Sequence, residues 1–181
     1  MSTQGPNSPG TVSEYDSVSS PWSNPGNIVS SNNSYATRAL TSGNDSDKLI
    51  ASNFGFSIPA GSTINGILVE VECKASAESS LQFENVILTP DGTWAGQVGD
   101  DKNDIGVYLG TTDAYKSYGG AADSWGRTWT STEINASGFG VILALLASAN
   151  ATGSIDHVRV TVYYTAGANP GKSSMQQLLV R

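Results

Sequence analysis

The sequence predicts an all-β fold, an antiparallel β-sandwich that is jelly-roll-like and has extended N- and C-terminal arms. Three observations predict this class. Only 14% of the residues are charged, while glycine (20 residues) and serine are abundant, which suits tight turns better than helices. About six to eight short apolar segments are separated by turn signals. Apolar and polar side chains also alternate over residues 67–73, the pattern of a half-buried strand.

The predicted strands are bounded by turns rich in Asn, Gly or Pro, and they cover residues 34–40, 49–56, 63–74, 80–89, 139–146 and 155–164. In the third of these, the apolar odd positions should face the core, while Glu70 and Glu72 should face water. In the last, the same alternation places His157 on the outer face and Asp156 on the opposite one. Residues 130–135 predict one capped helical turn, and 91–127 predict a long irregular region.

The chain divides into an N-terminal arm (1–27), a sandwich domain (28–165) and a C-terminal tail (166–181). The arm is dominated by Gly, Pro, Ser and Asn, so it has too little apolar surface to offset its ordering entropy. We expect the arm either to become ordered on a partner in an assembly or to fold back on its own domain. The side chains expected to anchor the arm and the tail to a partner are Pro21, Trp22, Pro25, Leu178 and Leu179.

Charge and cysteine content limit the function classes. The formal net charge is −7 and lies on the body of the chain, which argues against nucleic acid as a partner. The sequence has neither a signal peptide pattern nor an apolar stretch long enough for a membrane span. We therefore expect synthesis in a cytoplasm and no membrane partner. The single cysteine, Cys73, excludes an intramolecular disulfide and should be a buried small hydrophobe.

The sequence offers little for catalysis. One histidine, His157, and one cysteine cannot supply a zinc site, and a histidine on an outer strand face is expected to be an ordinary surface residue. Glu70 and Glu72 lie roughly 6.5–7 Å apart along one strand face, a spacing that glycoside cleavage could use. Because no aromatic platform shares that face, we expect no catalytic residues, no cofactor and no enzyme activity.

Two segments are candidates for ligand binding. The aromatic side chains between residues 94 and 129 could stack on sugar rings, or they could pin a long loop onto the sandwich. The candidates for sugar stacking are Trp94, Tyr115, Tyr118 and Trp125. The acidic loop 99–106 is a weak calcium candidate through Asp101, Asn103 and Asp104. Since Ile105 occupies the next ligand position of an EF-hand spacing, we expect a solvated loop and no bound metal.

Several segments carry a family resemblance in their order along the chain. They are Ser8–Val12, Pro21–Pro25, Tyr35–Thr37, Asn53–Gly61, Ile64–Ile67, Trp125–Thr130, Ile134–Val141, Ile155–Val158 and Val162–Tyr164. Together they resemble small β-sandwich structural proteins of tailed bacteriophages, of the virion decoration or minor structural type. The resemblance spans roughly residues 8–165, and related sandwiches also occur in tail fibres.

The resemblance implies a non-enzymatic virion component made in the host cytoplasm and present as a homo-oligomer or in repeated copies on a particle. Its main implied role is capsid decoration (a cement protein), with the arms bound to capsid or other virion proteins. The alternative is a receptor- or glycan-binding module of a tail or fibre, which would use the aromatic loop.

Overall fold

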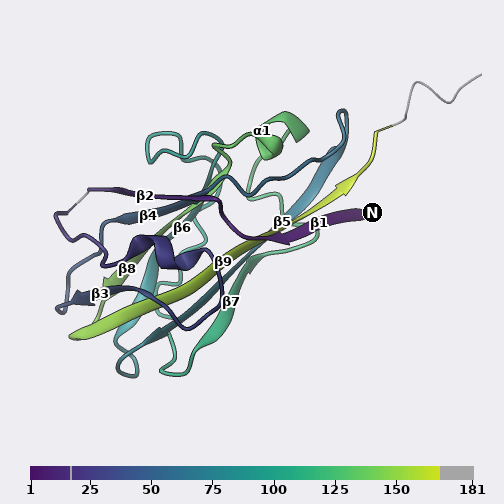
Figure 1. The fold of residues 1–181 in the computed structure, drawn as a ribbon. Coiled ribbons are helices and arrows are strands. Elements are labelled where there is room, and N and C mark those ends of the chain that lie inside the picture. The colour runs from purple at the N-terminus through teal and green to yellow at the C-terminus, as the bar shows by residue number, and fades with distance from the viewer. Residues whose placement is uncertain (17, 168–181) are drawn as a thin grey trace, which may run out of the picture.

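The computed structural model describes residues 1–16 and 18–167, which form two facing antiparallel sheets (Figure 1). In the first sheet the order is β1 (Ser2–Asn7), β9 (Ala151–Thr165), β5 (Thr63–Ala75) and β7 (Ala114–Gly119), and β3 (Ala36–Leu40) also pairs with β9. In the second sheet the order is β2 (Thr11–Tyr15), β4 (Lys48–Ser52), β8 (Gly140–Ala147) and β6 (Leu81–Thr89). Odd-numbered strands form one sheet and even-numbered strands the other, so successive strands cross between layers. This confirms the predicted antiparallel, jelly-roll-like sandwich.

The core lies between the two layers, and β5 shows why. Its residues Ile67, Val69, Val71 and Cys73 are all buried between the sheets, as the alternation predicted. Burial raises the pKa of the Cys73 thiol to about 12, so this free thiol stays protonated and packs as a small hydrophobe.

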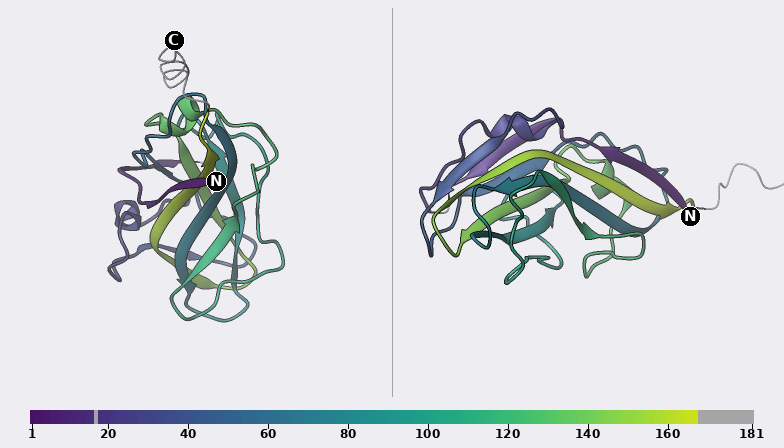
Figure 2. Two further views of the ribbon diagram at one scale, coloured as in Figure 1. Left: turned by 90° about the vertical axis from the view of Figure 1, so that its right-hand side faces the viewer. Right: turned by 90° about the horizontal axis from the view of Figure 1, so that it is seen from below.

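The N-terminal segment is extended, but it is paired with its own domain. β1 pairs with β9, with Ser2 opposite Tyr164, and β2 pairs with β4, with Thr11 opposite Ser52 (Figures 1 and 2). Of the two outcomes expected for residues 1–27, the described part shows the second, a segment folded back on its own domain. Backbone hydrogen bonds to two sheet edges offset the ordering entropy that its side chains cannot.

The expected anchors of this segment therefore need correction. Trp22 is only 5% exposed, and its indole N–H donates to the carbonyl of Asp47 at 2.9 Å, so it is a core residue rather than a free anchor. Pro21 is exposed and its carbonyl accepts from Arg38 Nη1 at 2.9 Å, while Pro25 begins the 3₁₀ helix η1 (Pro25–Ile28). Leu178 and Leu179 lie outside the described residues.

Other local predictions are confirmed or corrected. The predicted helical turn is α1 (Ser131–Asn135), with a complete capping box between Thr130 and Glu133. The strand predicted to reach residue 56 ends at Ser52, because Asn53 has a left-handed backbone (φ 60°). β7 lies in the region predicted to be irregular. Among the residues described, no helix has the length and hydropathy needed to cross a membrane.

A β-bulge in β9 changes which face two polar residues occupy. Glu72 lies opposite His157, but the next residue, Cys73, lies opposite Ile155, so Asp156 is the extra residue of the bulge. Ile155 and Val158 both belong to the core, while Asp156 and His157 both lie on the outer side of the sheet. The expectation that these two point to opposite faces is wrong, because simple alternation does not hold across a bulge.

Candidate functional site

The predicted sugar-stacking aromatics do not form one surface. Trp125 has no exposed surface, and its indole N–H donates to the carbonyl of Ile67 at 2.9 Å. Tyr118 is also buried, and its hydroxyl donates to Asp104 at 2.6 Å. These two side chains anchor the long connection to the core, so the expectation that they bind a ligand is wrong. Large aromatic side chains stabilise a fold mainly by burying their apolar surface.

Tyr115 is half-buried on the outer face of the first sheet, where its contacts are already satisfied. The Arg159 guanidinium lies over its ring, 3.9 Å from the centroid. Its hydroxyl lies 2.9 Å from His157 Nδ1. These contacts tie Tyr115 into a network on the outer face of the first sheet, apart from Trp94 on the second sheet.

Trp94 is half-buried, like Tyr115, but it lies on the second sheet. Its ring stacks on Tyr15, with centroids 6.2 Å apart and planes at 26°, and Tyr15 is 45% exposed. We call these two side chains the aromatic pair. Tyr15 ends β2 and lies opposite Lys48 of β4, so the pair sits on the outer face of the second sheet. Sequence reasoning missed Tyr15 because it assigned residues 1–27 to an arm.

A rigid turn after β6 positions Trp94. The Asp91 carboxylate accepts hydrogen bonds from the backbone N–H and the hydroxyl of Thr93, at 2.9 and 2.8 Å, and from the Thr89 hydroxyl at 2.9 Å. These bonds, first that from the Thr93 side chain, lower the pKa of Asp91. Gly92 supplies the left-handed backbone (φ 73°) that the turn requires.

Charged side chains adjoin the aromatic pair. Lys48 Nζ lies 5.2 Å from the Trp94 ring centroid and 2.9 Å from a carboxylate oxygen of Glu84. Asp45 in turn contacts Glu84, and burial and then the Glu84 charge raise the pKa of Asp45. We call Lys48, Glu84 and Asp45 the charged cluster. Because both carboxyl groups and the ammonium meet beside an aromatic surface, this site offers hydrogen-bond donors and acceptors next to an apolar platform.

A hollow continues from the charged cluster toward the first sheet. It is lined by residues 18–20, 38–41 and 43–45, so Asp45 belongs to both features. Arg38 also lines it, and its buried Nε has no hydrogen-bond partner among the described residues. The hollow therefore adds a charged donor to the polar groups beside the aromatic pair.

The acidic loop does not offer the calcium ligands considered for it. Asp101 accepts from the Val86 backbone N–H at 3.0 Å and from the Asn85 side chain at 2.8 Å. Asp104 lies 2.7 Å from Lys116 Nζ and also accepts from Tyr118. Asn103 is exposed between them. Since protein donors engage the two carboxylates, the loop is held against β6, while most of residues 99–106 are exposed to solvent, as expected.

The outer face of the first sheet carries a network around the single histidine. His157 is only 8% exposed, and its Nε2 lies 2.8 Å from Ser8 Oγ, which corrects the expectation of a surface histidine. Burial and then the Arg159 charge lower its pKa. Arg159 also holds Glu70 through two hydrogen bonds of 2.9 Å. Glu70 and Glu72 are thus not a pair of free carboxylates on a solvated face.

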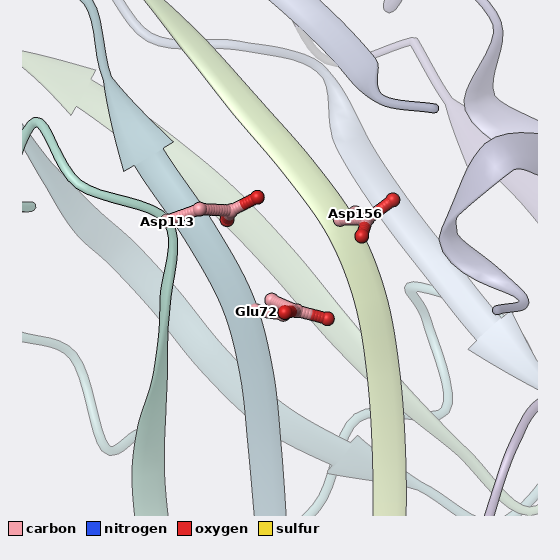
Figure 3. A group of neighbouring side chains, drawn as sticks. All are labelled: Glu72, Asp113 and Asp156. Carbon is pink, nitrogen blue, oxygen red and sulfur yellow. The ribbon is translucent and has the colours of Figure 1, made fainter. Parts of the chain in front are cut away.

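Three carboxylates meet beside this network, and Figure 3 shows the three side chains on neighbouring segments of the chain. They are Glu72 of β5, Asp113 just before β7, and Asp156 of the β9 bulge. One oxygen of each lies within 4.8 Å of the others. Sequence reasoning missed this group because its members are far apart in the chain and the bulge reverses the expected face of Asp156.

Neither a protein-family profile nor a curated protein matches the chain. Solved structures that are similar to this chain include carbohydrate-binding modules. A module described as CBM4 has 17% identity and a TM-score of 0.42, covering 72% of this chain and 85% of that one. A family 16 module has 12% identity and a TM-score of 0.35, covering 69% and 75%. The xylan-binding module CBM15 has 15% identity and a TM-score of 0.38, covering 87% and 99%. At such values, function has to be argued from this chain's own residues.

Proposed function

We propose that this protein is a non-catalytic glycan-binding module that uses the outer face of its second sheet. The observation that carries the proposal is the aromatic pair, the exposed Tyr15 and the half-buried Trp94, beside the charged cluster. A pyranose ring has an apolar C–H face and a rim of hydroxyl groups. The C–H face would stack on the aromatic rings, and the hydroxyls would bond to the side chains of the cluster.

The polar groups are already ordered: the Lys48 side chain is only 8% exposed, while the Glu84 side chain is 30% exposed and can meet a sugar hydroxyl. Lys48 is held by Glu84 and lies beside the Trp94 ring, so little side-chain entropy is lost on binding. The hollow beside Asp45 gives room for further sugar units, and the Arg38 guanidinium on its wall would suit a hydroxyl or a carboxylate there.

The place of action that we propose is a phage tail or fibre, on the strength of the resemblance of residues 8–165. Capsid decoration is the less favoured role, because Trp22, one of the anchors expected for it, is packed into its own domain. The tail anchors expected for it, Leu178 and Leu179, lie outside the described residues. Labelling of this protein on phage particles, seen by electron microscopy, would separate a tail location from a head location.

Affinity gel electrophoresis of the full chain tests the proposed binding. The gels would contain soluble xylan, mixed-linkage β-glucan, mannan or purified bacterial surface polysaccharide, and calorimetry would measure Kd for any polymer that retards the protein. Trp94→Ala and Tyr15→Ala should each weaken binding tenfold or more, since a truncated aromatic anchor costs about 2 kcal/mol.

Tyr163→Ala is the matched control, because this half-buried tyrosine lies on the first sheet, away from the aromatic pair. The control should bind like the unaltered chain. Retention that survives both Trp94→Ala and Tyr15→Ala would refute the assignment of the site. No retention by any of the polymers would contradict the proposed function.

A further inference from the structure

The three carboxylates on the outer face of the first sheet carry an inference that is independent of glycan binding. They come from three separate elements, yet one oxygen of each lies within 4.8 Å of the others (Figure 3). The β9 bulge makes this meeting possible, because without the extra residue Asp156 would point into the core. The fold therefore brings three acidic groups together through an irregular feature of its longest strand.

Each carboxylate of this group has one buried oxygen without a hydrogen-bond partner among the described residues. Asp156 is 1% exposed, and its Oδ2 accepts from the backbone N–H groups of Asn32 and Asn33, each at 3.0 Å. Its Oδ1 has no hydrogen-bond partner within the described residues, and the same holds for Glu72 Oε2 and Asp113 Oδ1. Buried polar atoms are nearly always satisfied. Each of the three clustered carboxylates thus has one buried oxygen that no described residue satisfies, which indicates a missing ligand that is positively charged.

The protein's own cations do not balance this charge. Lys74 Nζ approaches Asp113 to 3.9 Å, but it donates to the Tyr35 hydroxyl at 2.8 Å. Arg159 is hydrogen-bonded to Glu70, and its charge also acts on Glu72. The ring nitrogens of His157 contact Ser8 and Tyr115. Lys74 and Arg159 therefore offset only part of the charge of the three carboxylates, and a divalent ion would neutralise the remainder.

We infer that Glu72, Asp113 and Asp156 bind one calcium ion on the outer face of the first sheet. All the donor atoms are carboxylate oxygens, which select hard cations over zinc or copper. Ca²⁺ tolerates the irregular geometry of ligands from three unrelated elements better than Mg²⁺ does, because Mg²⁺ demands a near-ideal octahedron. Waters would complete the coordination shell.

The ion would link parts of the chain that otherwise meet only through a few hydrogen bonds. Asp156 holds the segment at Asn32 and Asn33, while Asp113 accepts from the Tyr35 hydroxyl at 2.6 Å. An ion on the same two carboxylates would fasten residues 32–35 and the connection before β7 to the central strands. Its effect on this protein should therefore be a gain in stability.

Calcium titration of the full chain, stripped with a chelator, tests this inference. Calorimetry should show binding with one ion per chain. At a hundredfold excess over Kd, Ca²⁺ should raise Tm by about 5–10 °C. Asp113→Asn and Asp156→Asn should each weaken Ca²⁺ binding at least tenfold, and both should raise Tm in the absence of the ion because they reduce repulsion.

The acidic loop offers a matched control. Asp101→Asn removes the same charge, but from a carboxylate that already accepts hydrogen bonds from Asn85 and Val86. This variant should bind Ca²⁺ like the unaltered chain.

If Asp156→Asn does not fold, the Ca²⁺ affinity of Asp113→Asn alone tests the inference. The inference is overturned if the folded chain shows no heat of binding up to about 10 mM Ca²⁺, because this concentration exceeds the Kd of ordinary extracellular calcium sites. It is also overturned by a preference for Mg²⁺ or by unchanged affinity of Asp113→Asn. Trp94→Ala should keep full Ca²⁺ binding, so the calcium inference and the proposed glycan binding can be refuted independently of each other.

Discussion

The indole N–H of Trp22 donates to the backbone carbonyl of Asp47 at 2.9 Å, and this bond is buried in the domain. It joins the segment after β2 to the residue that immediately precedes β4. The Asp47 carboxylate accepts in return from the backbone N–H groups of Val18 and Ser20, at 2.9 and 3.0 Å. Both the backbone and the side chain of Asp47 thus bond to residues 18–22, so Trp22 contributes to the stability of the domain.

Trp22→Ala should lower the free energy of unfolding by about 3–5 kcal/mol, because it removes a large buried side chain and leaves a cavity. Trp22→Phe keeps most of the packing. The missing hydrogen bond should lower the free energy of unfolding by about 1 kcal/mol, in addition to the effect of the smaller side chain. Urea unfolding followed by circular dichroism measures both. A Trp22→Ala variant as stable as the unaltered chain would mean that this segment is not part of the cooperative fold.

Trp125 and Trp94 should respond differently to the same substitution. Trp125→Ala should cost about 3–5 kcal/mol of stability, because the ring is fully buried and bonded to Ile67. Trp94→Ala should cost roughly 1 kcal/mol, since its ring is half-exposed. Thermal melting of the two variants side by side checks the contrast, and equal losses would contradict the division into core and surface aromatics.

Asp45 should make the fold less stable at neutral pH than at acidic pH. Its pKa in the folded chain lies above the ordinary 3.8, so the unfolded chain ionises more readily and stability falls as pH rises through that window. Asp45→Asn should therefore raise Tm by roughly 2 °C at pH 7. The gain should vanish near pH 3, where Asp45 is protonated in both states. A gain that persists at pH 3 would have another cause.

Asp91 should control the affinity of the aromatic pair without touching the ligand. Its pKa is lowered by the hydrogen bonds from Thr93 and Thr89, so the turn should loosen as pH falls through this value and the carboxylate is protonated. Asp91→Ala should mimic that state at pH 7 and weaken polysaccharide binding about three- to tenfold, because Trp94 loses its fixed position. Affinity electrophoresis at pH 7 measures this effect. Unchanged retention would show that the turn does not need Asp91.

The sequence predicted the parts of the fold where side chains carry the signal. The alternation along β5 is long and regular, and the Thr130 and Glu133 pair marks the start of α1, so both were predictable. β1 and β2 were not, because strands held to sheet edges by backbone hydrogen bonds need few apolar residues. Of the aromatic pair, Trp94 was identified, but Tyr15 was hidden in a segment that reads as a flexible arm.

The carboxylate group was beyond sequence reasoning for a different reason. Its geometry depends on one extra residue in β9, and a bulge leaves no periodic trace in a sequence. Asp113 moreover lies in a connection, where no alternation predicts direction. Such sites depend on the register between distant strands, which only the assembled sheets define.

The position of β9 has a consequence for how this chain is made. Although β9 comes last among the strands, it lies inside the first sheet, where it pairs with β1, β3 and β5 (Figure 1). During translation the earlier strands of that sheet therefore emerge without the partner that joins them. Their apolar faces and open edges must wait until residue 165 has left the ribosome, so this sheet closes only after synthesis of the domain is complete. A chain that stopped before residue 151 would expose those edges and would be prone to aggregate.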